Sequence, residues 1–491
     1  MWNSINQALN IIDNFVWGVP LMVLIIAGGL LLTIRLGLLQ IRKLPLALKW
    51  MLQNEEGGKG EISSFSALCT ALSATIGTGN IVGVATAVCA GGPGALFWMV
   101  VAAFLGMATK YSEGLLAVKY RTVAEDGHSL GGPFYYIELG MGKNFKWLAK
   151  IFAFFGVCVG LFGIGTFSQV NGISSAVHGF FDPNDAFTVK ILPFIGEYSW
   201  SVVIASLILS FCVAAVLIGG VKRIASVSQI IVPFMAVIYF VFAVILICCN
   251  ITKVPAAFAT IVTAAFSPKA ITGGSMLIAM QKGVARGIFS NEAGLGSAPI
   301  AAAAAQTNSP VRQGLVSMTG TFIDTIVICS MTCLSIVITG TWNTGLEGVA
   351  ITTAAFQQGL PFPPVVASFS LMLCLVFFAF TTILGWDYYS ERCLEYLSGG
   401  NMKHVKIFRW IYILAVFIGP YMTVSAVWTI ADIFNGLMAI PNMIALFALS
   451  GVIVKETRAF FQHAKEEARA EHRSFEEVCE ENLNEEEAPA N

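Results

Sequence analysis

The sequence predicts an all-α membrane protein with 11 transmembrane helices, and three observations support this fold class. Hydrophobic residues make up 56% of the 491-residue chain and charged residues only 12%, against roughly 25% charged in an ordinary soluble domain. The mean hydropathy is +0.76. Apolar runs of about twenty residues, the length at which a helix crosses a bilayer, recur along most of the chain. We therefore expect a protein that crosses a membrane many times.

The predicted spans follow the apolar runs in chain order. The first run, 15–34, has no Lys or Arg before it and no convincing small-residue cleavage site, so we expect a retained helix rather than a removable signal peptide. The other ten spans are expected at 64–90, 94–118, 150–178, 199–219, 228–250, 271–304, 314–340, 362–390, 409–425 and 431–454. Two shorter segments are not expected to cross. The glycine-rich segment 131–142 is predicted to be re-entrant or interfacial, and 345–361 is predicted to form an external cap.

The positions of Lys and Arg predict the orientation. With the N-terminus outside, 22 of the 28 Lys and Arg residues fall on the cytoplasmic side, and only Lys190, Lys253 and Lys269 fall outside. Cytoplasmic loops near helix ends have this excess of positive charge. We expect a multi-pass protein of the inner or plasma membrane, with its C-terminus in the cytoplasm. The glutamate-rich tail 455–491 is predicted to be a solvated helix that fades into disorder.

The reactive residue types argue against an enzyme. The eleven cysteines lie almost all in apolar segments without metal-ligand spacing, and the five histidines lie in loops, span ends or the tail. The sequence contains no GxxxxGK[ST] nucleotide-binding motif. We therefore expect no catalytic activity, no organic cofactor and no nucleic-acid partner, and the sequence names no protein partner.

The centre of the second span is the first candidate site. The sequence SATIGTGN (73–80) places glycines at mid-membrane, where they permit the backbone to unwind. An unwound point exposes carbonyls at the end of one half-helix and N–H groups at the start of the next. These suit the zwitterionic head of an amino acid, or a sodium ion beside a carboxylate. Close helix packing is the alternative, but it explains Asn80 poorly.

A second interrupted span lies about two hundred residues further on, in GVARGIFSNEAGLGSAP (283–299). When the first span is set aside, the two interrupted segments are the first and sixth of the remaining ten. This pairing is typical of transporters built from inverted repeats, with the site at the midplane. We expect a leading helix and linker (1–60), two five-helix repeats (61–270 and 271–454) and the tail. A channel or receptor is the rival class, but the chain has no repeated filter motif.

Four segments resemble a known family. They are GTGN, GGPGALFWMVVAAFLGMATKYSE (91–113), KGVARGIFSNEAGLGSAP (282–299) and LGWDYYSERC (384–393), and together they closely resemble the alanine or glycine:cation symporter family. The resemblance runs from about residue 14 to about residue 455. It implies the leucine-transporter-type fold and sodium-coupled import of a small neutral amino acid. Glutamine:sodium symport and proton coupling remain alternatives, as do serine and D-alanine as substrates.

The resemblance also implies ligands at the first interrupted span. The N–H groups of Thr78 and Gly79 would bind the substrate carboxylate, and Asn80 with the carbonyl of Thr75 would lie beside the substrate, where a second cation is also considered. The implied sodium ligands are Ser73, Thr75, Ile76, Thr381 and Thr382. Oxygen ligands suit a hard cation, although paired threonines in a membrane helix more often bond to their own helix.

Other candidate substrate contacts lie on three further segments. The amide of Gln169 can donate to a carboxylate and accept from an ammonium, or it can simply join two helices. Ser290 lies in the second interrupted segment. Phe167, Phe289 and Trp386 are candidate walls of a small side-chain pocket, although aromatic residues are more often core or interface residues.

Several charged residues are predicted at membrane depth. Lys110 and Glu113, three residues apart, are expected to pair with each other or to reach the membrane surface. A second group of charges, expected to pair among themselves as a gate, is Lys282, Arg286 and Glu292. Asp324 stands alone in its span, and an isolated acid there is a functional hypothesis by default.

Overall fold

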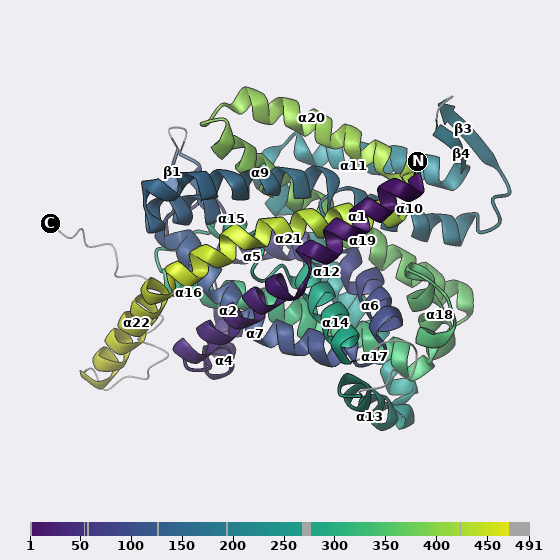
Figure 1. Cartoon of the computed structure of the whole chain (residues 1–491), viewed down its shortest axis with the longest axis horizontal. Coiled ribbons are helices and arrows are strands. Elements are labelled where there is room, and N and C mark those ends of the chain that lie inside the picture. Colours follow the sequence, from purple (N-terminus) through teal and green to yellow (C-terminus); the bar gives the residue numbers. More distant parts are fainter. Residues whose placement is uncertain are drawn as a thin grey trace.

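The computed structural model describes residues 2–53, 55, 58–124, 127–192, 195–267, 276–422 and 424–470, and most of them are helical (Figure 1). The helices are α1 (Trp2–Val16), α2 (Val19–Arg35), α3 (Leu39–Arg42), α4 (Leu44–Leu52), α5 (Ser64–Thr75), η1 (Gly79–Gly83), α6 (Val84–Gly91), α7 (Ala95–Lys119), α8 (Pro133–Tyr135), η2 (Tyr136–Met141), η3 (Lys143–Phe145), α9 (Lys146–Phe162), α10 (Phe167–Phe181), α11 (Trp200–Leu217), α12 (Gly220–Cys249), η4 (Ile251–Lys253), α13 (Val254–Ala265), α14 (Met276–Asn291), α15 (Ala298–Ala302), α16 (Pro310–Thr321), η5 (Phe322–Cys329), α17 (Ser330–Thr339), η6 (Thr341–Asn343), α18 (Val349–Gly359), α19 (Pro364–Leu397), α20 (Met402–Ile418), η7 (Gly419–Tyr421), α21 (Val424–Ala448) and α22 (Ser450–Ala470). Two antiparallel hairpins are formed by β1 (Thr122–Val123) with β2 (Ser129–Leu130), and by β3 (Thr188–Leu192) with β4 (Ile195–Ser199).

Many of these helices match the predicted spans. In the described ranges, seven helical segments are long and apolar enough to cross a membrane, and α5 with the segment 79–91, bent by 50°, makes an eighth. The shorter apolar helices α2 and α13 come in addition. The total of 11 spans and the division into two repeats stay predictions. The part of the predicted tail after residue 470 lies outside the described residues.

Two predicted spans have a break or an extra helix that the sequence did not predict. The run 150–178 forms α9 and α10, because the chain turns at Gly163–Thr166 and the N–H groups of Gly163 and Gly165 bond back to the carbonyl of Val159. The predicted first span, 15–34, corresponds to α2, and α1 before it was not predicted. Between these two helices Trp17 Nε1 donates to the carbonyl of Asp432 at 2.7 Å. Helix α13 was not predicted.

The two short segments lie against the helical core. The predicted re-entrant segment 131–142 forms α8 and η2, which pack against α9 and α21 with Phe134 and Ile137 buried. The predicted cap 345–361 contains α18, which packs against α17 and α19. The Thr352 hydroxyl of α18 donates to the carbonyl of Ile81 at 3.3 Å, so this helix contacts the first interrupted span directly.

Two long helices organise the interior. Helix α7 packs against α14, α16 and α2, and α19 packs against α9, α10, α12 and α5. In Figure 1 α1 and α2 run beside α21, and α22 projects beyond them at the side of the molecule away from the N-terminus. In lipid every backbone N–H and C=O group must be hydrogen-bonded within the protein. Where one of these helices breaks, the freed backbone groups therefore need other hydrogen-bond partners in the interior.

The two interrupted spans meet in the interior. Helix α5 ends at Thr75 and η1 begins at Gly79, while α14 ends at Asn291 and α15 begins only at Ala298. A Cβ on Gly79 would lie 3.3 Å from the ring of Phe289 and 3.4 Å from the Cα of Ser290. The absence of a side chain at Gly79 therefore lets the two breaks come into contact.

Candidate functional site

The first break is held open by an asparagine side chain. Ile76 leaves the helical conformation at ψ 94°, and the N–H of Gly77 donates to Asn80 Oδ1 at 2.9 Å. A Cβ on Gly77 would lie 2.5 Å from Thr382 Oγ1 and 2.8 Å from Gln169 Oε1. Glycine is thus required at this position, because side chains of two other helices occupy the space.

A hydroxyl of α19 reaches the carbonyl end of α5. Thr382 Oγ1 donates to the carbonyl of Ile76 at 3.2 Å and to Phe378 of its own helix at 3.0 Å. Two oxygens 3.2 Å apart fit adjacent positions around one hard cation, with ligand distances of roughly 2.3–2.6 Å. Ser73 lies on the same face, since a Cβ on Gly385 would lie 2.8 Å from its hydroxyl oxygen.

The side-chain hydroxyls of Thr381 and Thr75 form hydrogen bonds within their own helices and do not face the break. The Thr381 hydroxyl bonds to carbonyls of its own helix at 3.1 and 3.0 Å and contacts Met235 Sδ at 3.5 Å. The Thr75 hydroxyl likewise bonds back to Ala71 and Leu72, which leaves the predicted role of the Thr75 carbonyl untested. The structure brings Thr382 to the break, whereas an ion role for the Thr381 hydroxyl needs a change of side-chain rotamer.

The nitrogen side of the break faces Gln169 of α10. The N–H of Thr78 donates to Gln169 Oε1 at 2.9 Å, and Gln169 Nε2 donates to the carbonyl of Ile164 at 2.9 Å. The hydroxyl oxygen of Thr78 is buried and has no hydrogen-bond partner within the part of the chain that the structure describes. The amide oxygen of Gln169 therefore accepts the hydrogen bond from the Thr78 N–H that was predicted to bind the substrate carboxylate. The Thr78 hydroxyl, which has no partner among the described residues, lies beside that N–H.

Asp324 of η5 joins both breaks. One carboxylate oxygen accepts from Asn80 Nδ2 at 2.7 Å, and the other accepts from the hydroxyls of Ser290 at 2.9 Å and Thr325 at 2.7 Å. Asp324 is completely buried, and no Lys, Arg or His of the described ranges lies within 4.0 Å of its carboxylate. The sequence singled out Asp324 as an isolated acid but gave it no partners, because Asn80 and Ser290 come from two distant segments and only Thr325 is its neighbour in the chain.

The three aromatic candidates lie in different surroundings. Phe289 contacts the first break at Gly79. Trp386 is fully buried and donates from Nε1 to Glu292 Oε1 at 2.8 Å, so it holds the unwound residue of the second break. Phe167 packs instead with Ala415 in a small cluster between α10 and α20. The structure thus brings two of the three rings to the interrupted helices, and places Phe167 beside another helix.

The structure contradicts both alternatives predicted for Lys110 and Glu113, direct contact with each other and extension to the membrane surface. Both side chains are buried, and Lys110 Nζ donates to the carbonyl of Asn291 at 2.8 Å, while Glu113 Oε1 accepts from the N–H of Gly294 at 3.1 Å. Asn442 Nδ2 donates to the same Glu113 oxygen at 2.6 Å. Because α7 lies in the interior against α14, its charges bind the free backbone groups of the second break instead of each other.

The predicted gate pairs with a different helix. Arg286 of α14 makes two hydrogen bonds to Asp432 of α21, at 2.9 and 2.8 Å, and both side chains are largely buried. Glu292 bonds to Trp386 and Ser297. The expected pairing among Lys282, Arg286 and Glu292 is therefore wrong. The acid that binds Arg286 is 146 residues away in sequence, and no short-range pattern indicates it.

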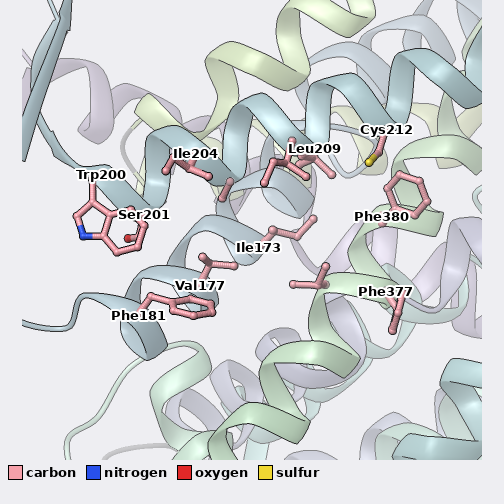
Figure 2. Close-up of a pocket in the computed structure, with 13 residues that line it drawn as sticks. Ile173, Val177, Phe181, Trp200, Ser201, Ile204, Leu209, Cys212, Phe377 and Phe380 are labelled. Atoms are coloured by element: carbon pink, nitrogen blue, oxygen red, sulfur yellow. The ribbon is translucent and has the colours of Figure 1, made fainter.

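A cavity of about 470 Å³ between α10, α11 and α19 is not the polar site (Figure 2). Figure 2 shows Val177, Phe181, Leu209 and Phe377 along its wall, and Ser201 is the single hydroxyl residue among those that line it. A charged amino-acid head group needs polar partners. The polar groups that suit it lie at the two breaks. All thirteen candidate residues are buried, although Phe167 lies away from the breaks.

Interrupted helices that meet inside a bundle of apolar helices, with unwound backbone facing buried polar side chains, define a membrane transporter. Residues 2–474 match the model of the sodium:alanine symporter family. The chain belongs to that family, and it is a transporter rather than an enzyme.

Individual relatives agree with this assignment. The chain is 53% identical to an uncharacterized transporter of Haemophilus influenzae over 94% of this chain and 97% of that protein. It is 46% identical to the sodium/alanine symporter AgcS of Methanococcus maripaludis over 94% of this chain and 98% of that protein. Among solved structures it resembles MhsT in complex with L-phenylalanine, with a TM-score of 0.54 and 13% identity over 87% of this chain and 97% of that one. That likeness shows the leucine-transporter-type fold.

Proposed function

We propose that this protein is a sodium-coupled symporter that imports a small neutral amino acid, alanine or glycine. One observation supports the ion site most directly: the hydroxyl of Thr382 on α19 lies 3.2 Å from the carbonyl oxygen of Ile76 at the end of α5. Sodium bound between them, with the carbonyl of Ser73, joins the first half-helix to α19. The 46% identical AgcS is named as a sodium/alanine symporter, which agrees with this choice of ion.

The substrate carboxylate binds at the N–H end of the first break. Thr78 offers an N–H that now donates to Gln169 Oε1, and beside it a buried hydroxyl without a partner among the described residues. A carboxylate displaces the Gln169 oxygen and uses both groups, and the amide of Gln169 then turns its N–H toward the substrate. Phe289 fills the space at Gly79, so a side chain of methyl size is favoured over that of glutamine.

Asp324 balances the positive charge that enters the site. Its carboxylate has three neutral hydrogen-bond donors and no positive side chain within 4.0 Å in the described part of the chain. A buried carboxylate without a cationic partner is costly. The charge of Lys110 reaches Asp324 only from a distance, because Lys110 Nζ bonds to the carbonyl of Asn291. The ammonium group of the substrate supplies a cation in direct contact with Asp324, at a position that both interrupted helices share.

We place the protein in the inner or plasma membrane with its N-terminus outside, on the distribution of Lys and Arg. In that orientation Arg286 and Asp432 lie on the outer side of the breaks, and together they form the outer gate.

Transport measurements in proteoliposomes test the function. Labelled alanine is expected to accumulate when a sodium gradient is imposed, and not when a proton gradient is imposed alone. Accumulation that ignores the sodium gradient would rule out sodium coupling. Competition by unlabelled glycine, serine, glutamine and D-alanine then ranks the substrates, and glutamine is expected to compete least.

Thr382→Ala is expected to raise the sodium concentration for half-maximal uptake by roughly tenfold or more, because a hydroxyl ligand to a charged group contributes about 1.5–3 kcal/mol. The order in which amino acids compete should stay the same. Thr263→Ala is the matched control, since that exposed hydroxyl bonds only to its own helix. Altered selectivity with unchanged sodium dependence would move Thr382 from the ion site to the substrate site.

If Arg286 and Asp432 form the outer gate, exchanging their charges tests it. Arg286→Asp or Asp432→Arg alone should lower uptake at least about thirtyfold, because each leaves a largely buried charge beside a like one. The double swap should recover much of the activity. Lys146→Gln is the control, because Lys146 is 55% exposed in its pair with Glu138 and exposed pairs contribute little. No recovery in the double variant would argue that the pair is not a gate.

A further inference from the structure

A second cavity lies far from the transport site, between the end of α2 and the final helix. Its volume is about 640 Å³, and its walls come from the end of α2 with the turn that follows it, α3, and one face of α22. In Figure 1 these elements lie together at one edge of the molecule. Nothing in the proposed transport mechanism uses this cavity.

The cavity is strongly positive. None of the residues that line it is acidic, and five are basic: Arg35, Arg42, Lys43, Arg458 and Lys465. The glutamates of α22 are not among the lining residues: Glu456 bonds to Lys119 of α7 at 2.8 Å, Glu467 lies 3.4 Å from His463, and Glu466 lies next to the lining residue Lys465. Like charges gathered in one hollow repel each other, and an anion bound there relieves that repulsion.

Parts of the cavity wall are already fixed in place. Arg35 Nη1 donates to Ser450 Oγ at 2.6 Å, Arg42 Nη2 donates to the carbonyl of Leu36 at 3.0 Å, and Lys43 Nζ lies 4.5 Å from the ring centre of Phe461. The contacts of Arg35 and Lys43 join α2 and the segment after it to α22, and the contact of Arg42 closes the turn that follows α2. The cationic groups are therefore held around the cavity before any ligand binds, which lowers the entropy lost on binding.

Exposed apolar side chains border the same cavity. Ile34, on its wall, is 67% exposed, and the neighbouring Leu38 and Ile41 are 46% and 57% exposed. In a transmembrane protein such side chains face acyl chains. A ligand that is anionic at one end and apolar at the other matches both features, whereas a soluble phosphate or the glutamate-rich residues 471–491 match only the charge.

We propose that this cavity binds the phosphate headgroup of an anionic phospholipid, whose acyl chains lie along Ile34, Leu38 and Ile41. Basic pockets between helices at the cytoplasmic surface bind lipid headgroups of this kind. Only the choice of the cytoplasmic leaflet rests on the proposed orientation. The lipid joins α2 to α22, and so stabilises the contact between these two helices.

Native mass spectrometry of the full-length protein tests this site. The protein is incubated with phosphatidylglycerol or with phosphatidylcholine of the same acyl chains, and retained lipid is counted. We expect phosphatidylglycerol to be retained at about one molecule per protein, and phosphatidylcholine to be lost. Uptake is not part of the measurement, so failure of the transport proposal leaves this result interpretable.

Two matched variants assign the binding to the cavity. Arg458→Gln with Lys465→Gln should weaken phosphatidylglycerol binding about thirtyfold, at about 1 kcal/mol for each removed cation. Lys403→Gln with Lys406→Gln removes the same charge from α20, at another edge of the molecule in Figure 1, and should leave binding unchanged. Equal binding by all three proteins, or equal loss in both variants, would overturn the site. Displacement of the lipid by excess glycerol phosphate would overturn the lipid as its ligand and assign the cavity to soluble phosphate compounds.

Discussion

Asp324→Asn is expected to abolish uptake, with a loss of at least about a hundredfold. The substitution keeps the size of the side chain but removes the negative charge that meets the incoming ammonium group, and removing one partner of a buried charge pair costs about 2–5 kcal/mol. It also turns one acceptor of the hydrogen bonds from Asn80, Ser290 and Thr325 into a donor. Initial rates of alanine uptake at saturating sodium, with expression measured in parallel, check this result.

The control for Asp324 is an acid outside the site. Asp185→Asn alters a side chain that is 61% exposed in a surface pair with His178, and uptake should remain near the wild-type rate. Substrate binding to purified Asp324→Asn, followed by isothermal titration, separates the possible causes. Normal alanine affinity together with weakened sodium affinity would show that Asp324 binds an ion and not the ammonium group.

Gly77→Ala is expected to produce a folded protein that transports at less than a tenth of the wild-type rate. The new methyl group would lie 2.5 Å from Thr382 Oγ1 and 2.8 Å from Gln169 Oε1, closer than such atoms approach without a shift. Overpacking of this kind costs roughly 1–3 kcal/mol. Here it separates the two side chains assigned to the sodium and to the carboxylate. Both the sodium and the alanine concentrations for half-maximal uptake should rise together.

Gly179→Ala is the control for this crowding. Gly179 lies in α10, and a Cβ there would meet nothing within 4 Å. Alanine favours a helix over glycine, so uptake should be unchanged and thermal stability unchanged or slightly higher. A normal rate in Gly77→Ala, with protein that elutes as a single species, would show that the contact of Gly77 with Thr382 and Gln169 is not part of the transport site.

The position of both interrupted helices was readable from residue types. Glycines at 77 and 79 beside Asn80 indicated unwound backbone in an apolar run, and the structure has α5 end at Thr75 with η1 starting at Gly79. The segment 283–299 likewise contains the break between α14 and α15. The break at Gly163–Thr166 between α9 and α10 was missed. Gly163 and Gly165 gave the same residue-type signal there, but the sequence does not show that the turn packs against Trp386, whose Cβ lies 2.7 Å from where a Cβ on Gly165 would be.

The partners of the buried charged residues could not be predicted from the sequence. Lys110 and Glu113 are three residues apart and looked like a helical pair, but each binds the backbone of the second break. Arg286 looked like a partner for Glu292, but binds Asp432. Spacing rules describe neighbours on one helix surface, and they fail where a helix is buried and other helices offer closer groups.

The sequence by itself determined that this chain is a helical membrane protein with two interrupted helices, and its motifs resemble one transporter family, to which the chain belongs. Those properties follow from local chemistry, since the length of an apolar run and the conformational freedom of glycine act within one segment. Only the tertiary structure decided that Thr382 meets Ile76, that Gln169 meets Thr78, and that Asp324 joins both breaks. Each of these contacts joins residues from different helices, and helix packing, not spacing along the chain, fixes which side chains meet.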